Sequence, residues 1–213
     1  SARIADAEAN ARFTPLAARA VRLTLRGNQI DATATLAEPK TGTTVTQVAI
    51  AHDLGSGTGN ATLAVDGLVF GKTLQPEALT RLTVGVVANV DGRIDGTGRV
   101  AWTPRGVTSS GRFTTNDLDL AAAFGPVDGL RGTVVFDDLL ALSTPPGQRV
   151  TLRLVNSGVE VRDGVIDYRL LPGQRVAIEA GRWPFAGGAL LLDPATLDFG
   201  RQAPRTLTFR VVG

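Results

Sequence analysis

Hydrophobic and polar residues alternate along most of the chain. In one early segment, Val21, Leu23 and Leu25 are separated by Arg22 and Thr24. A period of two places the apolar residues on one side of an extended strand and the polar residues on the other. The same alternation recurs in about fifteen short segments, most of them separated by turns that contain Gly, Pro or Asn. The pattern predicts an all-β fold built from successive antiparallel hairpins.

The segment 82–113 shows this pattern clearly. Apolar residues occupy alternate positions on both sides of Asp91-Gly92, a pair whose residue types accept the positive φ angles of a tight hairpin turn. The Pro-Arg-Gly sequence at 104–106 marks a second turn. We therefore expect three strands here, separated by these two turns.

Other local patterns predict further elements. Asp163-Gly164 repeats the Asp-Gly signal and predicts another hairpin. Residues 76–79 begin with proline, which the first turn of a helix tolerates, so we expect one helical turn. Residues 137–142 place two aspartates before leucines, the order of a short helix stabilised by negative charge at its N-terminus. Residues 5–13 alternate alanine with polar residues and predict a strand.

Several strands carry glycine or alanine on their apolar side, as at Gly96 and Gly98. Small residues there leave room either for a second sheet packed closely or for a ligand lying along the strands. The pattern alone is compatible with a filled sandwich and with an open groove.

Composition excludes several classes of function. The chain has 213 residues, enough for a substantial core, but only 5% aromatic residues and no cysteine. Disulfides, thiolate metal sites and a cysteine nucleophile are thereby excluded. The formal charge is +2 with no block of Lys or Arg, which argues against nucleic acid as a partner. No apolar run is long enough for a membrane-spanning helix.

The sequence offers little for catalysis. His52 is the only histidine, so a metal site lacks ligands and a polar residue at a strand end is the simpler interpretation. Ser109-Ser110 has no general base near it in sequence. We expect no catalytic residue, no metal and no cofactor.

A series of motifs follows in order between residues 74 and 192. They are Leu74-Gln75-Pro76, Asp91-Gly92-Arg93-Ile94, Val100-Ala101-Trp102, Ser109-Ser110-Gly111, Gly125-Pro126-Val127, the run from Gly132 to Leu139, Thr144-Pro145-Pro146-Gly147-Gln148 and Trp183-Pro184-Phe185-Ala186-Gly187-Gly188. Their order and spacing resemble the YdbH-like proteins, which carry a "dicarboxylate transport" domain and are similar to the AsmA-like proteins of the bacterial envelope. No arginine cluster on one strand face supports a dicarboxylate ligand.

The resemblance implies a fold and a function. AsmA-like proteins are anchored in the inner membrane and cross the periplasm as a taco-shaped antiparallel sheet that conducts phospholipids toward the outer membrane. We accordingly expect a single β-groove over residues 1–213, taken from the C-terminal part of a longer protein. Residues 1–73 would be its N-terminal strands, 74–192 the family-like segment and 193–213 the closing strands.

A lipid tail needs a continuous apolar track, because each methylene left in water costs about 0.8 kcal/mol. The expected groove lining is Val84, Val86, Ala88, Ile94, Val100, Trp102, Phe113, Leu152, Leu154, Val176, Ile178, Leu191 and Phe209. Trp183 and Phe185 adjoin a glycine pair, so we expect them at a rim touching lipid or, by preference, at a corner where they plug the end of the sheet.

Two other functions are also compatible with the sequence. One is a structural or adhesive β module that binds protein partners, among them outer-membrane or other envelope proteins, through an exposed strand edge. The same edges would allow two fragments to stack. The other is a hydrolase on a β scaffold, which the single histidine and the absence of cysteine disfavour.

Overall fold

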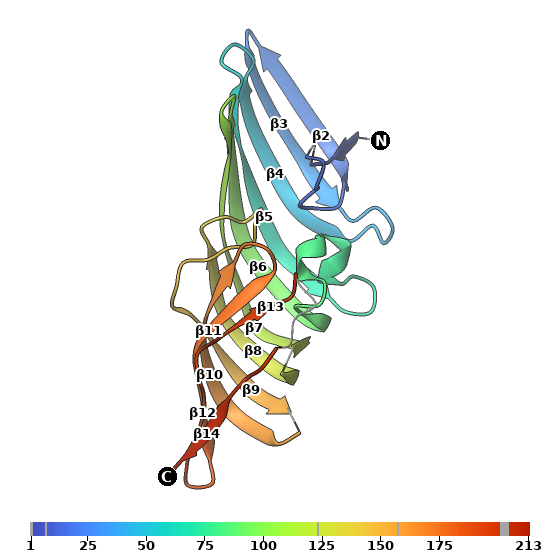
Figure 1. The fold of residues 1–213 in the computed structure, drawn as a ribbon. Coiled ribbons are helices and arrows are strands. Elements are labelled where there is room, and N and C mark those ends of the chain that lie inside the picture. The colour runs from blue at the N-terminus through green and yellow to red at the C-terminus, as the bar shows by residue number, and fades with distance from the viewer. Residues whose placement is uncertain (1, 7, 123, 157, 201–204) are drawn as a thin grey trace.

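A computed structural model describes residues 2–6, 8–122, 124–156, 158–200 and 205–213. They form one 14-stranded antiparallel sheet that is not closed into a barrel. The sheet is elongated and curved, with the two chain ends at opposite ends of the molecule (Figure 1). The predicted all-β fold of successive hairpins is confirmed.

The strands follow one another in the sheet almost in chain order. They are β1 (Ala2–Ile4), β2 (Leu16–Arg26), β3 (Gln29–Ala37), β4 (Thr44–Asp53), β5 (Thr58–Phe70), β6 (Ala88–Thr103), β7 (Gly106–Ala122), β8 (Gly125–Phe136), β9 (Gln148–Asn156), β10 (Glu160–Leu171), β11 (Arg175–Phe185), β12 (Gly188–Leu192), β13 (Ala195–Asp198) and β14 (Phe209–Val212). Only β13 and β14 depart from this order, since they pair with β11 and β12. Two 3-10 turns, η1 (Pro76–Ala78) and η2 (Arg81–Thr83), connect β5 to β6.

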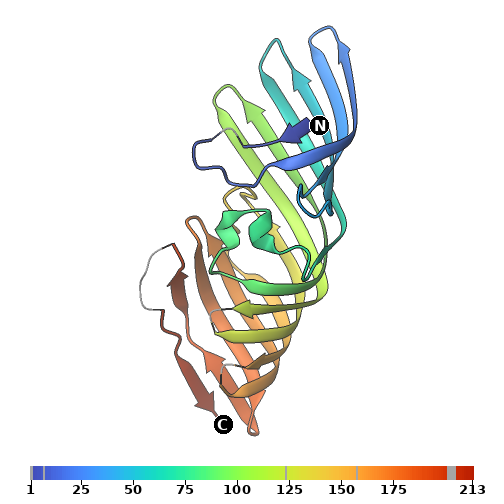
Figure 2. The ribbon, with the colours of Figure 1, turned by 90° about the vertical axis from the view of Figure 1, so that its right-hand side faces the viewer.

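Alternation gives the sheet two unlike faces. Val48 pairs with Leu63 on the side that we call the inner face, and Gln47 pairs with Ala64 on the outer face. The inner face is apolar and carries the buried side chains, whereas the outer face carries mainly Thr, Arg and Asp. The two 3-10 turns lie on the inner side of the curved sheet (Figure 2).

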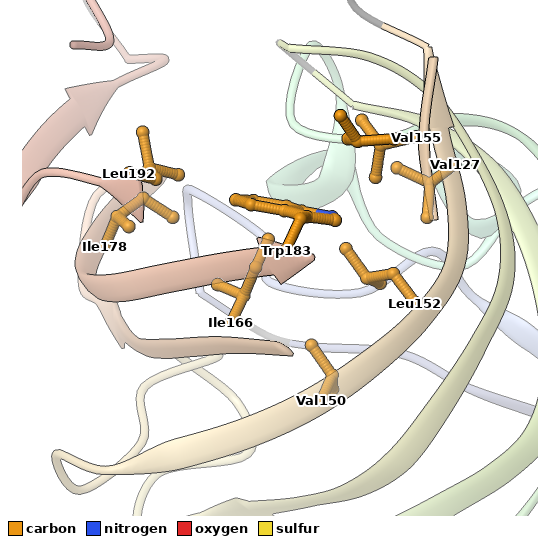
Figure 3. Packing of buried hydrophobic residues seen from close by; sticks show 9 residues of the cluster. Val127, Val150, Leu152, Val155, Ile166, Ile178, Trp183 and Leu192 are labelled. Carbon is orange, nitrogen blue, oxygen red and sulfur yellow. The ribbon is translucent and has the colours of Figure 1, made fainter. Parts of the chain in front are cut away.

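Buried residues on the inner face form three clusters along the sheet. The N-terminal cluster is Leu36, Val48 and Ala61; the middle cluster is Leu68, Phe70, Leu74, Val90 and Leu118; the C-terminal cluster is Val127, Val150, Leu152, Val155, Val161, Ile166, Ile178, Trp183 and Leu192. Figure 3 shows the indole of Trp183 at the centre of the last cluster, between side chains from several strands.

The predicted hairpin at Asp163-Gly164 is wrong, because β10 runs straight through this pair. Gly164 faces the indole of Trp183, and a Cβ added to Gly164 would lie 1.9 Å from the indole Nε1. Here the glycine makes room for an aromatic ring on the neighbouring strand. It is not part of a turn.

The predicted hairpin at Asp91-Gly92 is also wrong, and the segment before it, residues 84–87, is not a strand. Strand β6 runs continuously from Ala88 to Thr103. Gly92 has φ of 137° beside two register shifts, and a Cβ there would lie 2.5 Å from the Asp117 carbonyl oxygen. The glycine therefore allows β7 to approach at an irregularity within a continuous strand.

The predicted helix at 137–142 is wrong as well. These residues form a turn closed by the bridge between Asp138 and Ser143. The Asp138 carboxylate accepts hydrogen bonds from the backbone N–H groups of Leu140 and Ala141, at 3.0 and 3.1 Å. The acidic residue thus stabilises exposed N–H groups as expected, but the bridge leaves too few residues for a helix.

The predicted strand at 5–13 is replaced by a loop, of which Ala7 lies outside the described residues. Asp6 accepts hydrogen bonds from the Arg12 guanidinium at 2.7 and 3.1 Å, which draws the loop back on itself. By contrast, the turn at 104–106 and the helical turn beginning at Pro76 are confirmed.

Candidate functional site

The inner face carries a partly open apolar cavity of about 500 Å³ between the middle and C-terminal clusters. Strands β5 to β11 and β13 supply its walls. Among the described residues that line it, Arg175 is the only charged one. Ligand pockets of proteins are commonly of this size or larger and mainly apolar. This cavity can therefore accept a hydrocarbon chain but offers very little to a polar ligand.

The connection between β5 and β6 roofs the cavity. We call residues 75–87 the strap. Its lining side chains are Pro76, Leu79, Thr80, Leu82, Thr83, Val86 and Val87. The two 3-10 turns of the strap place leucines and valines toward the sheet, so the cavity is apolar above as well as below.

Polar contacts fasten the strap at both sides. Near its start, the Gln75 amide donates to the Val90 carbonyl at 2.8 Å and accepts from the Val90 N–H at 2.9 Å. Thr80 Oγ1 donates to the Arg12 carbonyl at 2.6 Å. On the far side, the Gln174 amide lies 3.1, 3.4 and 3.2 Å from the carbonyl oxygens of Arg81, Leu82 and Val84.

Burial in the cavity wall changes the pKa of the Tyr168 phenol. Desolvation raises the pKa of Tyr168 to about 12, because the phenolate form is disfavoured away from water. The phenol is therefore neutral at physiological pH, and the wall carries no negative charge there. This matches the apolar character of the rest of the lining.

The structure brings six of the predicted groove residues together around the cavity: Val86, Ile94, Phe113, Leu152, Val176 and Ile178. Val100 and Trp102 lie instead against the N-terminal cluster. Ala88, Leu154 and Leu191 are outside the cavity lining. The Val84 and Phe209 side chains are 53% and 37% exposed, since Val84 follows η2 and β14 lies at the sheet edge.

Trp183 and Phe185 lie near the end of β11, just before the turn into β12. Trp183 is 1% exposed and belongs to the C-terminal cluster, and Phe185 packs against the same cluster. The Trp183 Nε1 is buried and has no hydrogen-bond partner among the described residues. Neither residue is among those that line the cavity.

Sequence reasoning missed much of the lining. Missed wall residues include Phe70, Leu118, Leu130, Phe136 and Tyr168. Their alternation was visible in the sequence, but the strand pairing that unites them was not. Apart from Val86, the strap residues were missed for another reason, because the stretch from Leu82 onward had been predicted as a strand of the sheet rather than as a cover over it.

Two residues considered for metal binding and catalysis, His52 and Ser109, make hydrogen bonds within the fold. No group of three or more His, Cys, Asp and Glu among them could hold a metal ion. His52 Nδ1 accepts a hydrogen bond from Trp102 Nε1 at 3.2 Å, which satisfies this nitrogen structurally. Ser109 Oγ donates to Asp138 at 2.6 Å. Within the described segments, no helix has the length and apolar character to cross a membrane.

A comparison with protein families agrees with this apolar architecture. The family model described as "YdbH-like: Intermembrane phospholipid transport protein YdbH" matches residues 1–213. The match includes residues 1–73, which lie outside the motifs that carried the resemblance. No curated protein and no solved structure matches the chain.

Proposed function

Because the chain belongs to the YdbH-like family, described as intermembrane phospholipid transport proteins, we propose that it carries phospholipid tails along the inner face of its sheet. The family supports lipid transfer in general and implies a place in the cell envelope. Our more specific proposal is a periplasmic segment, in a protein anchored to the inner membrane, that passes phospholipid between the inner and outer membranes without catalysing a reaction.

The observation that carries this proposal is the unfilled apolar cavity under the strap. Its lining is nearly uncharged, and the cavity leaves about 500 Å³ that the protein's own side chains do not occupy. Transfer of each methylene of a lipid tail from water into such a space gains about 0.8 kcal/mol. The headgroup would stay in water at the open side of the sheet, because burying a charged phosphate without partners is costly.

A photo-crosslinking experiment tests the proposal with neighbouring positions as probe and control. Val134 lines the cavity, whereas Val135 belongs to the outer face beside Arg112. A photoreactive residue at Val134 should form a covalent adduct with phospholipid, and one at Val135 should not. Native mass spectrometry and solvent extraction should find phospholipid on the purified chain. A lipid-free protein, or equal labelling from both positions, would contradict the proposal.

One observation favours the second candidate function, a β module that binds protein through a sheet edge. In the part of the chain that the structure describes, β1 pairs with residues 16–18 of β2, and farther along β2 the Val21, Leu23 and Leu25 side chains are 49%, 63% and 57% exposed. A free strand edge beside exposed apolar residues is a template for strand addition. Pull-down of protein partners by a chain without bound lipid would favour this function.

A further inference from the structure

The strap crosses the cavity from one wall to the other. It begins in the connection between β5 and β6 and reaches the turn between β10 and β11, although β7, β8 and β9 lie between these elements in the sheet. Figure 2 shows the two 3-10 turns in front of the sheet rather than within it. In this position the strap screens part of the cavity from water.

The two ends of the strap are held in different ways. Its start is fixed by reciprocal hydrogen bonds between Gln75 and Val90 and by the N-terminal loop, where Thr80 bonds the Arg12 carbonyl. On the far side, the hydrogen bonds that described residues of the wall make to the strap all come from one side-chain amide, that of Gln174. An amide nitrogen has two hydrogens for these three carbonyl oxygens, so the far attachment is the weaker one.

Backbone geometry also permits movement near that attachment. Gly85 has φ of 77°, and a Cβ built on it would meet nothing within 4 Å. It follows η2 directly after Val84, the last residue that Gln174 contacts. A glycine in open space and in the left-handed region can absorb a change of backbone angle when the strap swings away.

We propose that the strap is a side gate for a lipid tail and that Gln174 is its latch. The proposal rests on the proposed function and adds the route by which the ligand reaches the cavity. When the latch opens, the tail enters sideways beneath η2 while the charged headgroup stays in water. When it closes, Leu82 and Val86 cover the tail.

Removal of the latch should speed lipid exchange. In Gln174→Glu the side chain keeps its shape, but the carboxylate faces three carbonyl oxygens with nothing to donate. The rate constant for transfer of a fluorescent-tailed phosphatidylglycerol to phosphatidylcholine vesicles should rise about five-fold or more. Gln47→Glu makes the same change on the exposed outer face and should leave the rate unchanged.

Covalent closure should have the opposite effect. The chain has no cysteine, so Gln174→Cys with Val84→Cys places two unique thiols on either side of the latch. A short bis-methanethiosulfonate should hold the gate shut and nearly abolish transfer, and reduction should restore it. The control pair Gln29→Cys with Asp53→Cys joins two paired strands away from the cavity and should not affect transfer.

The outcomes separate this proposal from the proposed function. If the unmodified chain binds no lipid, both fail. If it binds and transfers lipid, but neither the latch variant nor the cross-link changes the rate relative to its control, the strap is a fixed roof and the gate is wrong. The melting temperature of each variant, compared with the parent chain, shows whether a changed rate reflects the gate or loss of fold.

Discussion

At the scale of single residues, glycines make room for aromatic rings on the inner face. Trp183 lies across Gly164, and Trp102 lies across Gly59, where an added Cβ would come within 2.4 Å of the indole. A large ring lies flat on a sheet only if its cross-strand neighbour lacks a side chain. The space above Gly164 explains how a ring as large as that of Trp183 can be buried almost completely.

Gly164→Ala should therefore destabilise the protein by about 1–3 kcal/mol, because the methyl group overlaps the Trp183 ring and displaces it. Urea unfolding measures the change. Gly71→Ala is the matched control, since a Cβ there meets only the Asp91 carboxylate at an ordinary 3.4 Å. Equal stability of the two variants would show that Trp183 can move at little cost.

A second prediction at this scale concerns acid. Hydrogen bonds from the Arg12 side chain hold the pKa of the Asp6 carboxyl well below its usual range. Since the folded pKa is lowered, the carboxylate stabilises the fold above its ordinary value of 3.8, and this contribution is lost as the pH falls further. Asp6→Asn should cost about 1–2 kcal/mol near neutral pH, and the difference from the parent chain should shrink below about pH 4.

Denaturant titrations of both chains across this pH range provide the measurement. Asp66→Asn is the control, because the Asp66 side chain is 87% exposed and its contact with Arg93 is a surface ion pair. It should change stability only slightly at any of these pH values. A cost of Asp6→Asn that stayed constant into acid would contradict the assigned role of the carboxylate.

At the scale of elements, alternation predicted strands well and turns less well. Period-two patterns such as that of residues 21–25 identified the β class because they depend only on which side of a strand meets water. Asp-Gly pairs were ambiguous, because glycine permits both a tight turn and the close approach of a neighbour. Gly92 and Gly164 allow the close approach of a neighbour, so the need for glycine at these positions comes from residues of another strand.

The candidate site was predictable only in part for a related reason. Wall residues such as Ile94 and Val176 follow from alternation once the strands pair. The strap does not, because its position depends on the contact of Gln174 with carbonyls about ninety residues earlier in the chain. A side-chain amide that bonds backbone carbonyls leaves no periodic signal in the sequence.

The free edge of β2 gives a prediction about association. Leu23 is 63% exposed on the inner side of this edge, so we expect the purified chain to self-associate through it as concentration rises. Leu23→Lys should shift sedimentation toward the monomer. Thr24→Lys adds the same charge on the outer face of the same strand and should leave association unchanged. Both substitutions are at the surface and should change stability by about 0.5 kcal/mol or less.

At the scale of the whole molecule, one long sheet separates an apolar face from a polar face. The strap covers the apolar face between the middle and C-terminal clusters, while the inner face continues past it toward the N-terminal cluster. A single curved sheet can thus offer a sheltered binding position within a longer apolar surface. The binding energy at that position would come from hydrocarbon burial and owe little to charge.

The nearly uncharged lining of the cavity predicts how lipid binding responds to salt. Because Arg175 is the only charged residue among those described in the lining, raising the salt concentration from about 0.1 M to about 1 M should change the affinity for a single-tailed phospholipid by less than about two-fold. Calorimetry should show the negative heat-capacity change of apolar burial. A loss of affinity of ten-fold or more in high salt would mean that charged groups hold the lipid. In that case the outer face, which carries Thr, Arg and Asp side chains, and not the cavity under the strap, would be the place to look for the ligand.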